Sequence, residues 1–216
     1  MIKVYYSHTP FWRAEVLRVS LYISNIPFED VRISRDEFIN MIKTGFLPNG
    51  KRVPFHQLPV IEVDGEIIGQ TGAIARYCGK ISNLYSNDNI NAAKIDQIID
   101  AAQDINYLVT LSGRNKEPER KKIDRDILAN KHLPKWFQFL ENLLQQNTNS
   151  VYFVSNELTI ADLAIWRLLG WLKSGLLDGV PANILDNFEN LNKLREEVYK
   201  NPKVIKWMDQ VYGKVI

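Results

Sequence analysis

The secondary-structure pattern of the sequence changes once, between residues 84 and 91, from strands that alternate with helices to helices. This change constrains the fold more than any other feature. Before it, β-branched and aromatic runs predict strands at 2–7 and 28–33. Apolar residues at helical spacing predict helices at 13–24 and 36–43. Strands that alternate with helices in this way indicate an α/β unit with a mixed sheet.

The first part closes with a hairpin and a helix within residues 55–77, FHQLPVIEVDGEIIGQTGAIARY. The turn pair Asp64-Gly65 separates two short strands, at 60–63 and 66–69, which predicts a tight β-hairpin. We expect Thr71 at the N-cap of the next helix, where free backbone N–H groups and the helix dipole favour a carboxylate or phosphate. The alternative is a hairpin and helix start with a structural role only.

The second part is predicted to be helical almost throughout. Apolar residues recur on one broad face over 90–112 and again over 123–145. The polar stretch SNLYSNDN between the two parts is typical of a linker. The sequence therefore predicts an α/β domain at residues 1–83 and an all-helical domain at 90–216.

Charge and cysteine content exclude several functional classes. Across 216 residues, 27 Lys and Arg balance 25 Asp and Glu, and a net charge of +2 argues against nucleic acid or an anionic membrane as partner. The single cysteine, Cys78, excludes an internal disulfide, and three scattered histidines predict no metal site. The chain starts as a strand rather than a signal peptide, and its most apolar helix is too short to span a bilayer, so we expect a cytoplasmic protein.

An ordered set of features resembles the cytosolic glutathione S-transferases of the thioredoxin-fold superfamily. Gln57-Leu58-Pro59 precedes the hairpin, Gln70-Thr71 starts the helix, and Thr159-Ile160-Ala161-Asp162 predicts a capping box in the helical half. Trp12-Arg13-Ala14-Glu15 resembles the first helix of the tyrosine-type classes, sigma in particular. The resemblance covers essentially the whole chain. It implies a thioredoxin-like α/β N-terminal domain, an all-α C-terminal bundle and a homodimer.

The resemblance also implies glutathione as co-substrate, with no metal. Pro59 matches the family's cis-proline, which turns the backbone of Leu58 toward the cysteinyl amide of glutathione. Gln70 and Thr71 match the pair that holds the γ-glutamyl end, and Gln57 matches a position at the glycyl end.

Two further matches each have a structural alternative. Arg13 resembles the first-helix arginine near the peptide, and the alternative is an ion pair with an acid such as Glu15. Asp104 matches an aspartate that reaches the γ-glutamyl amine across the dimer interface, and the alternative is a solvated helix carboxylate. The role of the loop at residues 45–54 stays open.

The catalytic hydroxyl has three candidates. These enzymes place a hydroxyl donor against the glutathione sulfur, because only the thiolate is a useful nucleophile. Tyr6 matches the tyrosine-type position if one residue is inserted before Arg13, and without that insertion the register indicates Ser7. Thr9 lies in the same loop. Tyr5 and Tyr6 face opposite sides of a strand, so one of them belongs to the core.

A second substrate, a hydrophobic electrophile, would need a binding site near the glutathione sulfur, and apolar side chains suit the walls of such a site. The resemblance places this site between the two parts, lined by Phe11, Trp12, Tyr107 and Leu111, although an interdomain core has the same composition. The predicted function is a glutathione transferase, with conjugation, peroxide reduction and isomerisation all open. The alternative is a non-catalytic module of the same fold that binds other proteins.

Overall fold

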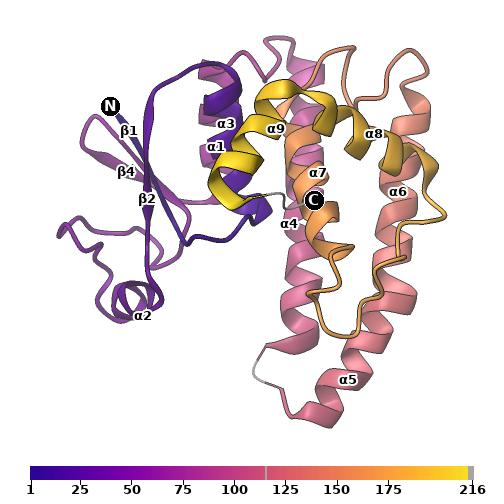
Figure 1. Ribbon diagram of the computed structural model, residues 1–216, viewed down its shortest axis with the longest axis horizontal. Coiled ribbons are helices and arrows are strands. Elements are labelled where there is room, and N and C mark those ends of the chain that lie inside the picture. Colours follow the sequence, from indigo (N-terminus) through magenta and orange to yellow (C-terminus); the bar gives the residue numbers. More distant parts are fainter. Residues whose placement is uncertain (115, 214–216) are drawn as a thin grey trace.

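The computed structural model describes residues 1–114 and 116–213, with the sheet on one side and the long helices α4 and α6 on the other (Figure 1). The first part consists of β1 (Ile2–Tyr6), α1 (Trp12–Ile23), β2 (Phe28–Arg32), α2 (Arg35–Thr44), β3 (Val60–Val63), β4 (Glu66–Ile68) and α3 (Thr71–Ile81). The second part consists of α4 (Asn89–Gly113), α5 (Pro118–Ile127), the π-helix η1 (Leu128–His132), α6 (Leu133–Gln146), α7 (Ile160–Leu172), α8 (Glu189–Lys200) and α9 (Pro202–Tyr212). The predicted order of strands and helices in the first part is confirmed.

The sheet has the strand order β2-β1-β3-β4 and is mixed, as predicted. β1 runs parallel to β2 and antiparallel to β3, and β3 pairs antiparallel with β4. In this register Tyr5 lies opposite Val60, so the end of β1 lies beside the segment that enters β3. The Leu58–Pro59 peptide bond in that segment is cis, which confirms the prediction for Pro59.

The start of α3 differs from the prediction by one residue. Gln70, with φ +70°, is the N-cap, and Thr71 is the first helical residue. The carbonyl of Gln70 accepts the first helical hydrogen bond, from the N–H of Ile74 at 3.0 Å. The prediction that Thr71 caps the helix is therefore wrong, because the chain already turns at Gln70.

The predicted helix at 123–145 contains a change of hydrogen-bond pattern. Leu128–His132 forms a π-helical turn between α5 and α6. Pro134 follows within the first turn of α6. A proline there has no N–H to donate, and its ring would clash with the carbonyl four residues before it in a regular α-helix. The wider turn removes this conflict while the chain stays helical.

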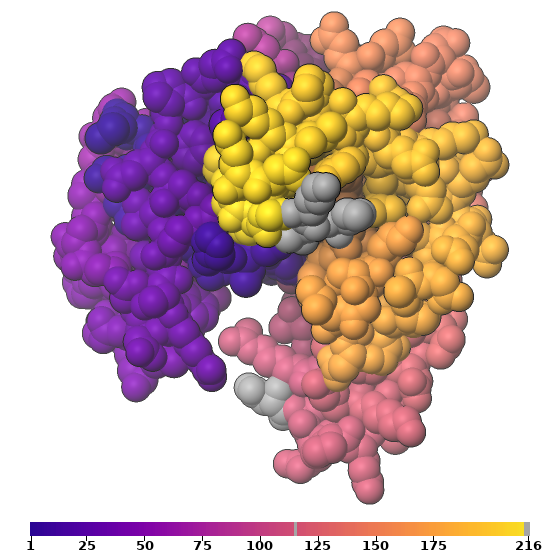
Figure 2. Space-filling model, viewed as in Figure 1, coloured from indigo at the N-terminus to yellow at the C-terminus, as the bar shows by residue number. Residues whose placement is uncertain are grey.

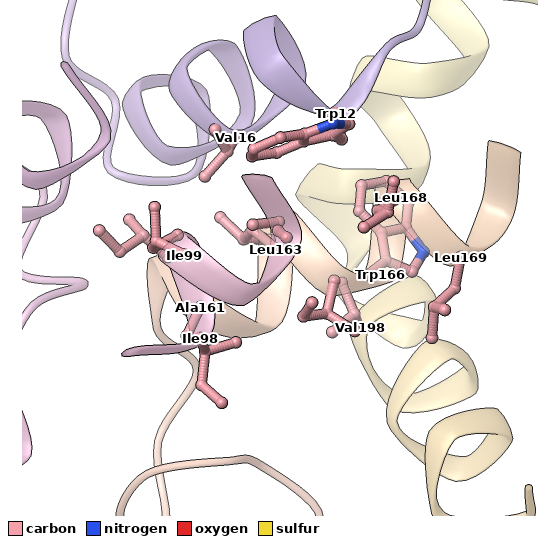
Figure 3. Close-up of a cluster of buried hydrophobic side chains, with 14 of the residues drawn as sticks. Trp12, Val16, Ile98, Ile99, Ala161, Leu163, Trp166, Leu168, Leu169 and Val198 are labelled. Carbon is pink, nitrogen blue, oxygen red and sulfur yellow. The ribbon is translucent and has the colours of Figure 1, made fainter. Parts of the chain in front are cut away.

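One hydrophobic cluster runs through both parts of the molecule. Figure 3 shows Trp12 and Val16 of α1 pointing toward Leu163 of α7 and Ile99 of α4. The division of the chain at residues 83 and 90 stays a prediction, because both parts share this core. Among the described residues, no helix is both long and apolar enough to cross a membrane.

The capping box that opens α7 is confirmed. The fully buried carboxylate of Asp162 accepts hydrogen bonds from the N–H groups of Phe153 at 2.9 Å and Thr159 at 2.8 Å, and from the Thr159 hydroxyl at 2.8 Å. Burial raises the pKa of Asp162 to about 6. These hydrogen bonds hold the start of α7 against the loop that precedes it.

Asp162→Ala should lower the free energy of unfolding by about 3 kcal/mol, because it leaves buried backbone donors without an acceptor. Urea denaturation measures this change. Asp126→Ala is the matched control, since Asp126 is exposed on α5, and it should change stability by less than about 0.5 kcal/mol. Equal losses in the two variants would contradict this role of Asp162.

Candidate active site

Two adjoining cavities lie where the end of β1, the cis-proline segment and the start of α3 meet. The larger has a volume of about 390 Å³ and the smaller about 120 Å³. Arg13, Gln57 and Leu58 line both, so the two cavities adjoin at these residues and are described together as one candidate site. In Figure 2 a notch opens between the first part of the chain and the α4–α5 end. Arg114, which follows the last residue of α4, lines the larger cavity.

The structure brings most of the predicted site residues together. Tyr6 and Ser7 line the larger cavity, and Pro59, Gln70 and Thr71 line the smaller. Their shared location follows from the register of β1 with β3 and from the hairpin that leads into α3. The role of each residue toward a ligand stays a prediction.

The two neighbouring tyrosines of β1 have opposite environments. Tyr5 is buried, its hydroxyl donates to Glu62 Oε2 at 2.8 Å, and it accepts from Asn49 Nδ2 at 3.0 Å. Tyr5 is therefore the core residue of the pair. The Tyr6 side chain faces the cavity, and among the described residues its hydroxyl has no hydrogen-bond partner.

The environment of Tyr6 keeps its hydroxyl protonated. Burial raises its pKa above the ordinary value, while the positive charges of Arg13 and Arg18 oppose this effect. A phenol with a raised pKa carries its proton at neutral pH, so Tyr6 has a hydrogen to donate into the cavity.

The other two hydroxyl candidates, those of Ser7 and Thr9, form a hydrogen bond with each other. Ser7 Oγ and Thr9 Oγ1 lie 2.7 Å apart at an exposed position. Ser7 lines the larger cavity, whereas Thr9 is not among the lining residues. Both hydroxyls thus have a partner already, in contrast to that of Tyr6.

Arg13 has no acidic partner among the described residues. Its Nε is buried without a hydrogen-bond partner, and burial lowers its pKa. The ion pair considered for it is wrong, because Glu15 pairs with Arg18 instead, at 2.9 Å. Arg13 therefore presents an uncompensated positive charge to both cavities, which suits an anionic ligand.

A buried network holds the loop that follows Tyr6. Glu15 accepts from Arg18 Nη1 at 2.9 Å, from Trp207 Nε1 at 2.8 Å and from the Tyr212 hydroxyl at 2.6 Å. Arg18 Nη2 also donates to the carbonyl of Ser7 at 3.2 Å. These hydrogen bonds thus hold the loop after Tyr6 in position against α1 and α9.

The predicted electrophile-site residues lie in different environments. Phe11 is half-buried and packs edge-on against Trp171, with ring centroids 4.9 Å apart. Tyr107 and Leu111 lie one turn apart on α4 and are 61% and 48% exposed. Trp12 is fully buried, and its Nε1 donates to Asn106 Oδ1 at 3.3 Å. The prediction that Trp12 lines an open site is therefore wrong; it belongs to the shared core.

Sequence reasoning missed several lining residues of the site: Ile33, Ser34, Arg35, Phe38 and Arg114 in the larger cavity, and Phe55 and Gln103 in the smaller. Gln103 of α4 lines the smaller cavity, whereas its predicted neighbour Asp104 is exposed and lines neither cavity. Arg114, at the end of α4, lines the larger. Gln103 lies on the helix predicted to flank the site, and Arg114 is the residue that follows the end of α4. The helical period alone does not tell which polar residues of α4 face the other half of the molecule.

The sequence matches two family models. One is described as "Glutathione S-transferase, N-terminal domain" and matches residues 3–80, and the other as "Glutathione S-transferase, C-terminal domain" and matches residues 103–210. The chain belongs to the glutathione S-transferase family. The predicted fold, a thioredoxin-like domain followed by an all-α bundle, is confirmed by these matches together with the mixed sheet.

Relatives of this transferase match over most of their length. A glutathione S-transferase of Plasmodium yoelii yoelii is 32% identical over 197 residues, which cover 89% of this chain and 86% of the relative. The hematopoietic prostaglandin D synthase of Gallus gallus is 29% identical over 198 residues, 92% of this chain and 90% of the relative. The structure of prostaglandin synthase D of Nilaparvata lugens has a TM-score of 0.83 at 26% identity, and the match covers 97% of this chain and 98% of that structure. The predicted class, a glutathione transferase enzyme, is confirmed.

Cysteine chemistry does not contribute to this site. Cys78 is buried in α3, and burial raises the pKa of its thiol to about 12, so it stays protonated and unreactive. Within residues 1–114 and 116–213, no group of three His, Cys, Asp or Glu side chains is placed to hold a metal ion.

Glu15→Gln should lower the free energy of unfolding by about 3 kcal/mol, because the buried Arg18 loses a charged partner. Guanidinium denaturation followed by tryptophan fluorescence measures the loss. Glu29→Gln removes a half-exposed carboxylate that pairs with Lys3, and it should cost less than about 1 kcal/mol. A Glu15 variant as stable as the wild type would show that the network does not hold the loop.

Proposed function

We propose that this transferase uses the Tyr6 hydroxyl to stabilise the thiolate of glutathione for attack on a hydrophobic electrophile. The observation that carries the proposal is the placement of the two β1 tyrosines. Tyr5 is held by Glu62 and Asn49, whereas the protonated hydroxyl of Tyr6 faces the cavity beside Arg13. A preorganised donor of this kind lowers the pKa of a bound thiol by stabilising the anion.

The smaller cavity suits the γ-glutamyl end of the peptide. Gln70, Thr71 and Gln103 supply polar groups there, and the start of α3 offers unpaired N–H groups to a carboxylate. The backbone of Leu58, next to cis-Pro59, would pair with the cysteinyl amide, which places the sulfur toward the larger cavity and Tyr6.

The opposite end of glutathione would lie in the larger cavity. Gln57 lines both cavities and would meet the glycyl end, while the half-buried charge of Arg13 lies between the two. An anionic peptide would supply the negative charge that Arg13 lacks among the described residues.

The electrophile would bind beyond the sulfur, against Phe11, Tyr107 and Leu111. The high exposure of the two α4 residues leaves apolar surface for a hydrophobic substrate. Conjugation is the reaction we favour, and isomerisation is the second candidate, because relatives of this chain include both glutathione S-transferases and a prostaglandin D synthase. Both reactions begin with the same thiolate.

We also propose a cytoplasmic homodimer. Asp104 is exposed on α4, where it contacts neither cavity of its own chain, as expected for a carboxylate that reaches a partner's site. Phe55 lines the smaller cavity and is nevertheless 58% exposed, which suits a residue covered by a second copy.

Tyr6→Phe should raise the thiolate pKa of bound glutathione by about two pH units and lower kcat about 100-fold, because one charge-stabilising donor is lost. Titration of the thiolate absorbance and turnover of 1-chloro-2,4-dinitrobenzene measure the two effects. Assays at a pH between the two thiolate pKa values separate the enzymes most clearly, because the wild-type thiol is ionised there and the variant's is not.

Ser7→Ala and Thr9→Ala are the matched controls, and both should keep the wild-type thiolate pKa. If the thiolate pKa of bound glutathione rose in one of these two variants and not in Tyr6→Phe, the catalytic donor would be the hydroxyl removed in that variant. Failure of the wild type to bind glutathione at millimolar concentration would instead favour the non-catalytic module.

Asp104→Asn should raise KM for glutathione several-fold with little change in kcat, because it weakens binding rather than chemistry. Analytical ultracentrifugation should show a dimer in both proteins. Asp100→Asn is the control on the same helix, with a carboxylate 3.9 Å from Arg76 in the same chain, and its KM should stay at the wild-type value. A wild-type monomer with full activity would contradict the shared site.

A further inference from the structure

The larger cavity of the candidate active site carries an excess of positive charge. Arg13, Arg35 and Arg114 line it, and no acidic side chain of the described residues does. In the function proposed above, two negative charges of glutathione enter this cavity, the thiolate and the glycyl carboxylate. The γ-glutamyl carboxylate would lie in the smaller cavity instead. One of the three guanidinium groups is therefore left without an anion.

The positions of the three arginines show which of them is left over. Arg13 lines both cavities, so it lies along the peptide. Arg35 begins α2, in the same part of the chain as Gln57, which we place at the glycyl end. Arg114 comes from the opposite side of the site, directly after the last residue of α4. Arg114 is therefore the cation that glutathione leaves unmatched.

Arg114 continues the face of α4 that we assign to the electrophile. Its N–H donates to the carbonyl of Thr110 at 2.9 Å, so its main chain still follows the hydrogen-bond pattern of the helix. Leu111 lies one turn before it and Tyr107 two turns before it, which places the three side chains on one face. Leu111 and Tyr107 are both exposed. An uncovered apolar surface thus ends at a positive charge.

The charge of Arg114 is not neutralised by its surroundings. The ion pairs at this end of the molecule join other residues, namely Asp124 with Lys116 and Arg120, and Asp178 with Lys121 and Arg125. Among the described residues, Arg114 forms no ion pair within 4 Å. The negative end of the α4 dipole supplies only about half a charge. The guanidinium of Arg114 is therefore available to an anionic ligand.

The main chain from which Arg114 extends is held in place before any ligand binds. The buried Arg125 donates from Nη1 to the carbonyl of Val109 at 2.9 Å and to the hydroxyl of Ser112 at 2.6 Å, both in the last turns of α4. Fixing the end of the helix in advance lowers the entropic cost of binding there.

We propose that the second substrate of this transferase is an electrophile that carries a carboxylate, which Arg114 binds while the apolar body covers Tyr107 and Leu111. This inference rests on the function proposed above and names the substrate class which that function leaves open. A neutral electrophile would cover the same apolar surface but would leave Arg114 unmatched.

Two glutathione conjugates that differ in one charge test the proposal. Attack of the thiolate on 4-chloro-3,5-dinitrobenzoate forms a C–S bond and breaks the C–Cl bond, and chloride leaves with the electron pair. The product carries a carboxylate on its ring, whereas the product from the methyl ester of this substrate has a neutral ring. In calorimetry with the purified products, the wild type should bind the acid about tenfold more tightly, as expected for one charge-assisted hydrogen bond.

Arg114→Gln should remove this preference for the acid, and Arg114→Lys should keep it because lysine retains the charge. Arg35→Gln removes a cation from the same cavity and should weaken the binding of both products equally. Lys122→Gln is the matched control, since Lys122 is exposed on α5 and lines neither cavity, and it should bind both products as the wild type does. Thermal melts confirm that each variant is folded.

A preference for the acid that survives in Arg114→Gln would overturn the proposal, and so would its loss in Lys122→Gln. If the wild type bound neither product, the proposed function would fail and this inference with it. If Arg114→Gln lost the preference while Tyr6→Phe left the thiolate pKa of bound glutathione unchanged, the role of Tyr6 would be wrong and the carboxylate-bearing substrate would be supported.

Discussion

The fully buried guanidinium of Arg18 is the interaction on which the arrangement of the site depends. It donates to Glu15 within α1, to Asp30 of β2 at 2.9 Å, to Tyr212 at the end of α9 at 3.1 Å and to the carbonyl of Ser7 at 3.2 Å. A buried charge is tolerated when its donors are satisfied, and each of these partners comes from a different element. The loop after Tyr6 therefore cannot shift without breaking a bond to a buried charge.

The contrast with Arg13 explains how one helix serves both structure and ligand binding. The two arginines lie five residues apart on α1, and one has acidic partners while the other faces the cavities with its Nε unpaired among the described residues. The same contrast separates Tyr5 from Tyr6 on β1. Groups whose hydrogen bonds are complete hold the fold, and those left incomplete beside a cavity are available to a ligand.

Local patterns in the sequence were sufficient for the order of strands and helices, the hairpin and the capping box at Thr159, because each depends on neighbouring residues. The cis bond at Pro59 was predicted from the family resemblance instead. Features set by tertiary packing could not be predicted in this way. The periodicity of α1 does not show that Trp12 lies in the shared core, nor that Glu15 pairs with Arg18 rather than Arg13. The choice of Gln103 over Asp104 likewise depends on how α4 is rotated against the first part of the molecule.

The crystal structure of the complex with glutathione tests the central claim most directly. The account predicts the glutathione sulfur within hydrogen-bonding distance of the Tyr6 hydroxyl, with the γ-glutamyl carboxylate at the Gln70–Thr71 start of α3. A sulfur bound instead to the hydroxyl of Ser7 or Thr9, with Tyr6 out of reach, would contradict it.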